Sequence, residues 1–287
     1  MAIVYEKIKN WPFPPVEHDY KAKDCMLYAL GVGLGADPLD AQQLRFVYED
    51  GLQMLPTMPV VLAGPGFWAI NPETGINWKA ILHGEIGLTI VKPLPVQGCV
   101  VGKTSILEVV DKGEGKGALI YTKRDIVDKA SGEVMAVVTS TSFCRADGGF
   151  GGPSGPVNKP HPVPDRACDA SCALPTLPQA ALIYRLSGDY NPLHADPAVA
   201  AVGGFKAPIL HGLCTYGVAG HAIVKTLCGY DGTKLRRLDA RFSSPVYPGE
   251  TIRTDMWNEG PGKAAFRCFV VERNVMVLDN GRAEFTA

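Results

Sequence analysis

Several features that would assign a chain to a class at once are missing from these 287 residues. No uninterrupted apolar run approaches the roughly 18 residues that a bilayer-crossing helix needs, so membrane insertion is not expected. The N-terminal stretch MAIVYEKIKNWPFPP lacks a basic segment followed by a long apolar one, and the C-terminal GRAEFTA carries no peroxisomal or retention tripeptide. These absences predict a cytoplasmic protein.

An excess of charge of one sign is also missing, because 28 Lys and Arg residues face 29 Asp and Glu residues, for a formal net charge of −1. Without a basic excess, nucleic acid is not an expected partner, although a small local patch could still hold a phosphate. Hydrophobic residues make up 46% of the chain and charged residues 20%, which is typical of a globular protein with a real core.

The eight cysteines are scattered, and many lie in apolar stretches. Free, buried thiols of a reducing compartment are distributed in this way. The cysteines in apolar surroundings are Cys25, Cys99, Cys214, Cys228 and Cys268. Cys168 and Cys172 are the closest pair, but no second pair or histidine cluster accompanies them, so no metal site is predicted there.

Of two common functional motifs, the dinucleotide-binding pattern occurs in the wrong structural context and the serine-hydrolase elbow is absent. The segment from Gly31 to Ala36 fits the dinucleotide pattern G-x-G-x-x-G/A, which needs a strand before it and a helix after it. The preceding DCMLYAL is typical of a helix, and Asp37-Pro38 interrupts the helix that should follow. No G-x-S-x-G elbow occurs, which argues against a serine hydrolase.

A Gly/Pro-rich segment divides the chain. Ten of the twenty residues from Asp147 to Arg166 are Gly or Pro, a composition that disfavours a helix or a central strand. We therefore expect an N-terminal unit over 1–146, a linker over 147–170 and a C-terminal unit over 171–287.

The two units follow the same order of predicted elements. In each, a strand reaches a Pro/Gly corner, KPLPVQG or SPVYPGE, and further strands follow around a Gly-Lys turn and a tight turn. The tight turns are KASG and Asp279-Asn280-Gly281, the latter a hairpin signal. Apolar helix-like stretches precede the strands: DCMLYALG in one half, QAALIYRLSG and HGLCTYGVAGHAIVKTLCG in the other. The repetition predicts an α+β fold built by duplication.

The stretch YRLSGDYNPLH places Asp189, Asn191 and His194 within six residues. Ser-Gly-Asp and Asn-Pro form turns, so the helix before them should end here and bring a carboxylate and an imidazole together. The same residue types also form an ordinary Asx turn with a surface histidine, and the pattern D-x-N-P-x-H alone favours that interpretation.

A second informative stretch, Pro208-Ile-Leu-His-Gly212, precedes an apolar helix predicted over 213–227. A glycine at a helix N-terminus lets backbone N–H groups approach a ligand at the positive end of the helix dipole. This arrangement suits a thioester oxygen that becomes an enolate, although the segment taken alone favours a simple helix start after a loop.

Together these stretches resemble a known family. YRLSGDYNPLHADP is similar to the signature of the MaoC-like, (R)-specific enoyl-CoA hydratases, or hydratase 2, and the likeness continues through GGFKAPILHGLCTYG and DARFSSPVYPGETIRTDMW. QMLPTMPVV, ILHGEIGLTIVKPLP and VVDKGEG resemble the companion domain of two-domain members, as in the hydratase region of peroxisomal multifunctional enzyme type 2. The resemblance implies a double hot-dog fold, in which each repeat is an antiparallel sheet wrapped around one long helix.

The resemblance also implies a lyase that hydrates a trans-2-enoyl-CoA to a (3R)-3-hydroxyacyl-CoA without a metal or other cofactor. The catalytic pair would be Asp189 and His194, helped by Asn191, with Gly212 as the oxyanion-hole residue. Which of the pair acts as the base stays open. Expected contacts to the acyl-CoA are His83, Gly84, Lys112, Tyr190, Pro192, Leu193 and Phe242.

The first half lacks this catalytic set. Matching LYALGVG to IYRLSGD places Gly33 opposite Asp189, and no histidine follows until His83, so we expect one active site per chain. The resemblance implies that the first half lodges the acyl tail instead, with Met54, Leu55 and Met58 as candidate pocket residues, although core packing is an equal explanation for each. A homodimer is among the assemblies the chain allows.

Two alternative functions would use the same acyl-CoA ligand. A hot-dog acyl-CoA thioesterase would share the fold and the substrate, but water would attack the carbonyl carbon. A non-catalytic acyl-CoA-binding protein would leave the Asp189 and His194 pair without a purpose. The G-D-x-N-P-x-H signature favours the hydratase over both.

Overall fold

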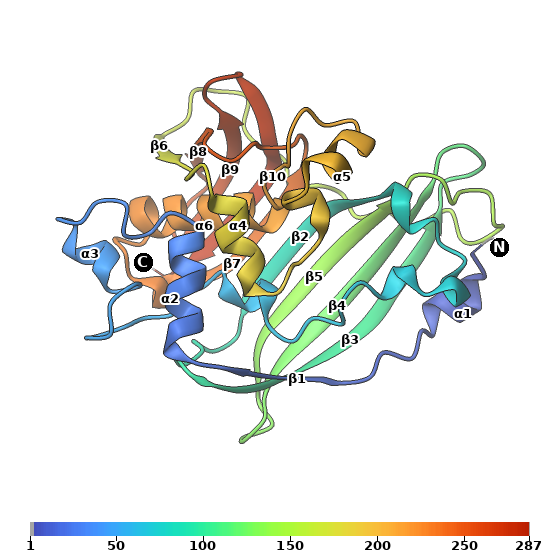
Figure 1. The fold of residues 1–287 in the computed structure, drawn as a ribbon, viewed down its shortest axis with the longest axis horizontal. Helices are drawn as coiled ribbons and strands as arrows, with labels where there is room; N and C mark the ends of the chain where they lie inside the picture. Colours follow the sequence, from blue (N-terminus) through green and yellow to red (C-terminus); the bar gives the residue numbers. More distant parts are fainter. Residues whose placement is uncertain (1–2, 287) are drawn as a thin grey trace.

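The computed structural model describes residues 3–286, and Figure 1 shows their arrangement. The helices are α1 (Tyr5–Lys9), α2 (Ala22–Gly31), α3 (Ala41–Leu44), α4 (Ala180–Tyr184), α5 (Pro197–Val202) and α6 (Gly212–Leu227). The first-half strands are β1 (Val16–Tyr20), β2 (Ile81–Ile90), β3 (Gly98–Asp111), β4 (Ala118–Asp128) and β5 (Val134–Cys144). The second-half strands are β6 (Ala170–Pro175), β7 (Leu235–Phe242), β8 (Thr251–Asn258), β9 (Lys263–Val270) and β10 (Val275–Phe285).

All ten of these strands belong to one antiparallel sheet, in the order β1-β3-β4-β5-β2-β7-β10-β9-β8-β6. Read outward from its centre, the sheet has the same connectivity on both sides, since β2, β5, β4, β3 and β1 correspond to β7, β10, β9, β8 and β6. The two repeats meet where β2 pairs with β7, from Glu85 opposite Arg241 to Thr89 opposite Arg237. The predicted duplication and the double hot-dog α+β fold are confirmed.

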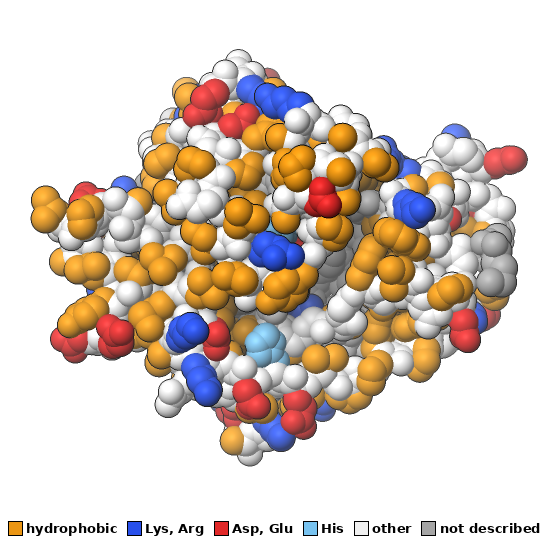
Figure 2. Space-filling model, viewed as in Figure 1, with side chains coloured by type: hydrophobic (Ala, Val, Ile, Leu, Met, Phe, Trp, Pro, Cys, Tyr) orange, Lys and Arg blue, Asp and Glu red, His pale blue; other side chains and the backbone are white. Residues whose placement is uncertain are grey.

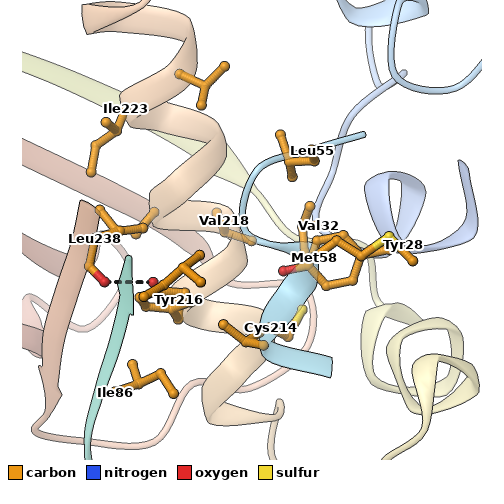
Figure 3. Close-up of a cluster of buried hydrophobic side chains, with 14 of the residues drawn as sticks. Tyr28, Val32, Leu55, Met58, Ile86, Cys214, Tyr216, Val218, Ile223 and Leu238 are labelled. Atoms are coloured by element: carbon orange, nitrogen blue, oxygen red, sulfur yellow. Dashed lines mark hydrogen bonds between the residues drawn. The ribbon is translucent and has the colours of Figure 1, made fainter. Parts of the chain in front are cut away.

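The long helix α6 is enclosed by both halves. Every residue from Cys214 to Val224 is buried, as expected for a helix that is apolar on all sides. In Figure 3 its side chains lie between Leu238 of β7 and residues of the first half such as Val32 and Met58. The Tyr216 hydroxyl donates to the Leu238 carbonyl at 2.8 Å, which ties the helix to the sheet.

The first half has no counterpart of α6 among its described residues, which differs from the expectation of one long helix in each repeat. Residues 41–80 instead form α3 and four short 3-10 turns. The turns are Met58–Val61, Trp68–Ile70, Pro72–Thr74 and Trp78–Ala80. Four prolines occur in this segment, and each removes a backbone donor that a continuous helix would need.

One predicted turn is wrong. Asp279-Asn280-Gly281 lies inside β10 as a bulge, with register shifts on both sides, and the hairpin turn to β9 occurs earlier, at 271–274. Asn280 has φ 54°, and this left-handed conformation serves a bulge as well as a turn. Tertiary partners stabilise the bulge, because Arg267 donates to Asp279 at 2.8 Å and Asn280 donates to the His161 carbonyl at 2.8 Å.

The Gly/Pro-rich segment is free of helices and strands from Arg145 to Asp169, in accord with its composition. It is nevertheless held at its start, because the Asp111 carboxylate accepts hydrogen bonds from the N–H groups of Gly149 and Gly151 at 2.7 and 2.8 Å. All eight cysteines are free thiols. Within residues 3–286, no helix combines the length and the apolar character that crossing a bilayer requires.

Close contact between α6 and the first half leads to a prediction about stability. A Cβ atom on Gly217 would lie 2.6 Å from Val32 Cγ1 and 3.0 Å from the Tyr28 hydroxyl. Gly217→Ala should therefore lower the free energy of unfolding by about 1–3 kcal/mol through overpacking, although alanine is the better helix former. Urea denaturation followed by circular dichroism measures this change.

Gly31→Ala is the matched control, because a Cβ atom at this helical glycine would meet its nearest neighbours at 3.6 Å, an ordinary contact. This variant should keep or slightly raise the stability. Equal losses in the two variants would show that helix packing at Gly217 is not tight.

Candidate active site

The predicted turn holds Asp189, Asn191 and His194 together. α4 continues into a 3-10 turn over Arg185–Ser187, which ends at Gly188 with φ 115°. The Asp189 side chain then accepts from the Asn191 N–H at 3.1 Å, and the Asn191 side chain accepts from the Leu193 N–H at 3.0 Å. Both Asx turns form, but His194 is not a surface residue, because only 8% of it is exposed.

His194 is held in one tautomer. Its Nδ1 lies 2.8 Å from the Ile209 carbonyl oxygen, which can only accept, so Nδ1 carries the proton and Nε2 keeps its lone pair. Burial lowers the pKa of the imidazole, and the Ile209 hydrogen bond and the Asp189 charge offset only part of this. The ring is therefore neutral near pH 7, with Nε2 free to accept a proton.

A second histidine, His211, completes the cluster. Its ring stacks on that of His194, with the centroids 3.8 Å apart, and its Nε2 donates to the Asp189 carbonyl at 3.1 Å. Burial, and then the neighbouring His194, lower the pKa of His211 to about 4. Polar side-chain atoms of Asp189, His194 and His211 lie within 4.8 Å of one another.

His211 was not among the predicted site residues. It stands directly before Gly212 in the stretch that predicted the helix start, and this position was the only signal for it. Carboxylate and imidazole groups also bind divalent metals. His194 Nδ1 and His211 Nε2 are engaged with backbone carbonyls, so a metal ion would have to bind through His194 Nε2 and His211 Nδ1.

Gly212 begins α6, as predicted, with His211 as its N-cap residue. The first N–H groups of a helix have no intrahelical acceptor, so the Gly212 N–H is available to a ligand at the positive end of the dipole. Space is limited here, because a Cβ atom on Gly212 would lie 3.1 Å from Phe242 Cε1.

The first half reaches the cluster through His83 on β2. Its ring packs on Phe242 at the end of β7, with the centroids 4.7 Å apart, and its Nε2 lies 2.9 Å from the Ser140 hydroxyl. Burial lowers the pKa of His83 to about 4, while the charge of Asp189 acts in the opposite direction. Gly84 lies at the bulge where the β2–β5 register shifts.

Other predicted contact residues lie farther out. Tyr190 is 58% exposed, with the Arg185 guanidinium 5.0 Å above its ring, and Pro192 and Leu193 lie on the surface of the same turn. Lys112 follows the end of β3 and is three strands from β2, roughly 14 Å across the sheet. The structure does not bring Lys112 into the cluster.

The candidate pocket residues of QMLPTMPVV divide between the core and a cavity. Leu55 and Met58 pack in the core near α6, as Figure 3 shows. Met54 lines a separate cavity of about 320 Å³ together with Ile90 and Leu235. Ile90 and Leu235 are at the ends of β2 and β7 opposite to His83 and Phe242, and the role of this segment in lodging an acyl tail stays a prediction.

Comparison with solved structures identifies the fold class of the chain. A conserved hypothetical protein of Mycobacterium tuberculosis with a double hot-dog fold matches 96% of this chain and 94% of its own, with a TM-score of 0.57 at 13% identity. An oleoyl thioesterase of Lactobacillus plantarum matches with a TM-score of 0.53 at 10% identity. At such low identities the likeness shows the fold alone. The chain is thus a double hot-dog protein.

Matches at higher sequence identity identify the family of the chain. Residues 159–280 match the model of the MaoC like domain, and residues 18–146 match that of the MFE-2 hydratase 2 N-terminal domain. A MaoC-like dehydratase from Phytophthora capsici superposes with a TM-score of 0.87, at 37% identity over 99% of this chain and 98% of that one.

Two curated relatives agree. The 3-hydroxyacyl-thioester dehydratase Y of Mycobacterium tuberculosis is 41% identical over 95% of both chains. The peroxisomal enoyl-CoA hydratase 2 of Arabidopsis thaliana is 38% identical over 92% of this chain and 90% of its own. The chain belongs to the MaoC-like hydratase 2 family in its two-domain form, and it is a lyase.

The buried imidazoles lead to a prediction about pH. An unfolded histidine binds a proton below about pH 6.5, whereas His211 in the folded chain binds one only near its pKa of about 4. The unfolded state therefore binds more protons between these values, and stability is lost as the pH falls through this window. His211→Gln should make the loss shallower by up to about 1.4 kcal/mol per pH unit.

Urea unfolding of both proteins at several pH values between 7 and 4.5 measures the two slopes. The pH dependence of their difference isolates His211 from the carboxylates, because these titrate in both proteins. Parallel curves would mean that His211 is protonated in the folded state as readily as in the unfolded one.

Proposed function

We propose that the chain hydrates trans-2-enoyl-CoA to (3R)-3-hydroxyacyl-CoA, and catalyses the reverse dehydration. The observation that carries this proposal is the meeting of the Asp189 carboxylate, the unprotonated His194 Nε2 and the first N–H groups of α6. Acid–base groups beside an anion-stabilising helix end are what addition of water to an enoyl thioester requires. The names of the relatives, a 3-hydroxyacyl-thioester dehydratase and an enoyl-CoA hydratase, support the choice of substrate.

In the proposed reaction one water lies between Asp189 and His194. The His194 tautomer favours Nε2 as the base, which takes a proton as the water oxygen bonds to C3. The Asp189 carboxylate accepts a hydrogen bond from the other O–H group, which stays on the oxygen as the new hydroxyl, and orients the attacking lone pair. The imidazolium then gives its proton to C2 on the same face, so that one water has been added and the site is restored.

The thioester oxygen gains charge while C2 awaits its proton. A hydrogen bond from the Gly212 N–H would stabilise this enolate-like oxygen, and one such donor contributes about 3 kcal/mol. His211 would position the pair, because it stacks on His194 and bonds to the backbone of Asp189. Asn191 would maintain the turn through its bond to the Leu193 N–H.

The rest of the assignment is also proposed from the sequence resemblance. The acyl-CoA would contact the following residues: His83, Gly84, Lys112, Tyr190, Pro192, Leu193 and Phe242. Charges of both signs are interspersed on the face shown in Figure 2, in keeping with a small-molecule substrate rather than nucleic acid. The non-catalytic role of 1–146, the single site in 171–287, a homodimer, a cytoplasmic location and the absence of a metal or cofactor remain predictions.

The test of the proposal uses crotonyl-CoA. Its enoyl absorbance near 260 nm should disappear without release of a thiol, and chiral analysis should find the (3R) product. Release of free CoA would identify a thioesterase, and no reaction would favour an acyl-CoA-binding protein. A (3S) product would contradict the proposed stereochemistry.

The acid–base pair is tested by substitution. Asp189→Asn and His194→Ala should each lower kcat by at least about 100-fold with the fold intact, because positioned acid–base groups contribute about 10²–10⁴ in rate. His221→Gln is the control, since this buried histidine bonds to Val32 and Tyr230 outside the cluster. Circular dichroism confirms folding. Near wild-type turnover in either pair variant would refute the assignment.

A further inference from the structure

A cavity of about 210 Å³ lies on the inner face of the first-half sheet, where residues 65–69 and Ile76 cover it in place of a long helix. The residues that cover the cavity are mostly apolar, but several of the strand residues that form its floor are polar. The polar floor residues come from β3, β4 and β5, and they are Thr104, Thr122, Arg124, Ser140 and Ser142. A pocket that served only to hold an alkyl chain would not need them.

A series of side-chain contacts runs from the cavity to the first residue of α6. The Ser140 hydroxyl in its floor lies 2.9 Å from His83 Nε2, and the His83 ring packs on Phe242. Phe242 in turn abuts Gly212, the first residue of α6. To enter this cavity, an acyl chain whose thioester oxygen binds at Gly212 would have to pass the His83 and Phe242 side chains.

Arg124 is the unusual residue of the floor. It pairs across the ladder with Thr104, and its guanidinium donates to the Val60 carbonyl at 2.7 Å. Its Nε and the Thr104 hydroxyl are both buried without a hydrogen-bond partner. Guanidinium stays charged, yet burial alone accounts for its lowered pKa of about 10, and no ion pair within residues 3–286 includes it.

A partly buried guanidinium without an ion-pair partner, whose buried Nε and whose neighbouring hydroxyl both lack a hydrogen-bond partner, is rare in native structures and is consistent with a bound anionic ligand. We propose that the cavity binds a carboxylate at the far end of the acyl chain, held by Arg124 and Thr104. The planar guanidinium suits a carboxylate, and the Thr104 hydroxyl supplies a further donor. This inference rests on the proposed function, and its substrate class is the ω-carboxy-2-enoyl-CoAs.

The geometry of the sheet sets the distance from Ser140 to Arg124. Arg124 is two residues along β4 from Thr122, which pairs with Ser140 on β5. Its backbone is therefore about 8 Å from that of Ser140, from the usual rise and spacing of strands. Chains of medium length should fit, and shorter ones should leave their carboxylate in the apolar part of the cavity.

The experiment compares ω-carboxy-2-enoyl-CoAs of six to twelve carbons with methyl-ended ones of the same lengths, and crotonyl-CoA serves as the reference. The wild type should have the higher kcat/KM for the carboxylated member at one or more medium lengths. Arg124→Met should lower that kcat/KM by about 10- to 100-fold, as expected for lost charge-assisted hydrogen bonds. Its kcat/KM for crotonyl-CoA should stay within about twofold.

Thr104→Val is the second variant, and it keeps the Arg124 contact with Val60. It should lower kcat/KM for the carboxylated substrate several-fold and leave the methyl-ended one unchanged, so the proposal can be judged even if Arg124→Met misfolds. A preference for methyl-ended chains in the wild type would overturn it. So would an equal fall for all substrates in a folded Arg124→Met, which would make Arg124 only an anchor for the segment near Val60.

A separate measurement distinguishes this proposal from the proposed function. If crotonyl-CoA is not hydrated, the proposed function fails, and calorimetry with a saturated ω-carboxyacyl-CoA still tests the cavity. Tighter binding to the wild type than to Arg124→Met, with equal binding of the methyl-ended analogue, would support the carboxylate site. Equal affinities for the carboxylated ligand would overturn it.

Discussion

The pairing of β2 with β7 is the constraint on which the rest of the structure depends. It joins two five-stranded repeats into one sheet, and it is the only direct ladder between them within residues 3–286. The core then becomes common to both halves, and α6 can be buried on all sides although a single repeat would leave part of it exposed. The same junction puts His83 of one half against Phe242 of the other.

Burial determines the chemistry of the cluster at this junction. His83, His194 and His211 all have a lowered pKa because they are removed from water, and backbone carbonyls hold two of them in a defined orientation. A neutral imidazole with a free Nε2 can accept a proton near pH 7, whereas a solvated one would be partly protonated. Asp189 remains accessible to solvent at the mouth of the turn.

The repeats have diverged in complementary directions. The second keeps the long helix whose N-terminus faces the Asp189 turn. The first replaces that helix with turns containing four prolines, and the space beneath residues 65–69 remains as a cavity. Among the described residues, the first half therefore has no long-helix N-terminus like the one at Gly212.

The sequence by itself determined the order of the long strands and the position of α6. Stretches between Pro/Gly corners and tight turns predicted the long strands, and an apolar stretch predicted α6. Turn residues grouped Asp189, Asn191 and His194, and Gly212 marked the start of α6. These features depend on neighbours within a few residues, so local patterns are sufficient to predict them. The resemblance to a family added the pairing of the two repeats into one fold.

The tertiary structure alone decided the contacts between distant segments. Asn280-Gly281 forms a bulge because Arg267 and the His161 carbonyl bind it, and an isolated Asn-Gly pair favours a turn. His211 joins the cluster by stacking on His194, seventeen residues away along the chain, and Met58 is buried in the core. Such outcomes depend on how α6, β2 and β7 pack, and packing is not encoded in any short stretch of residues.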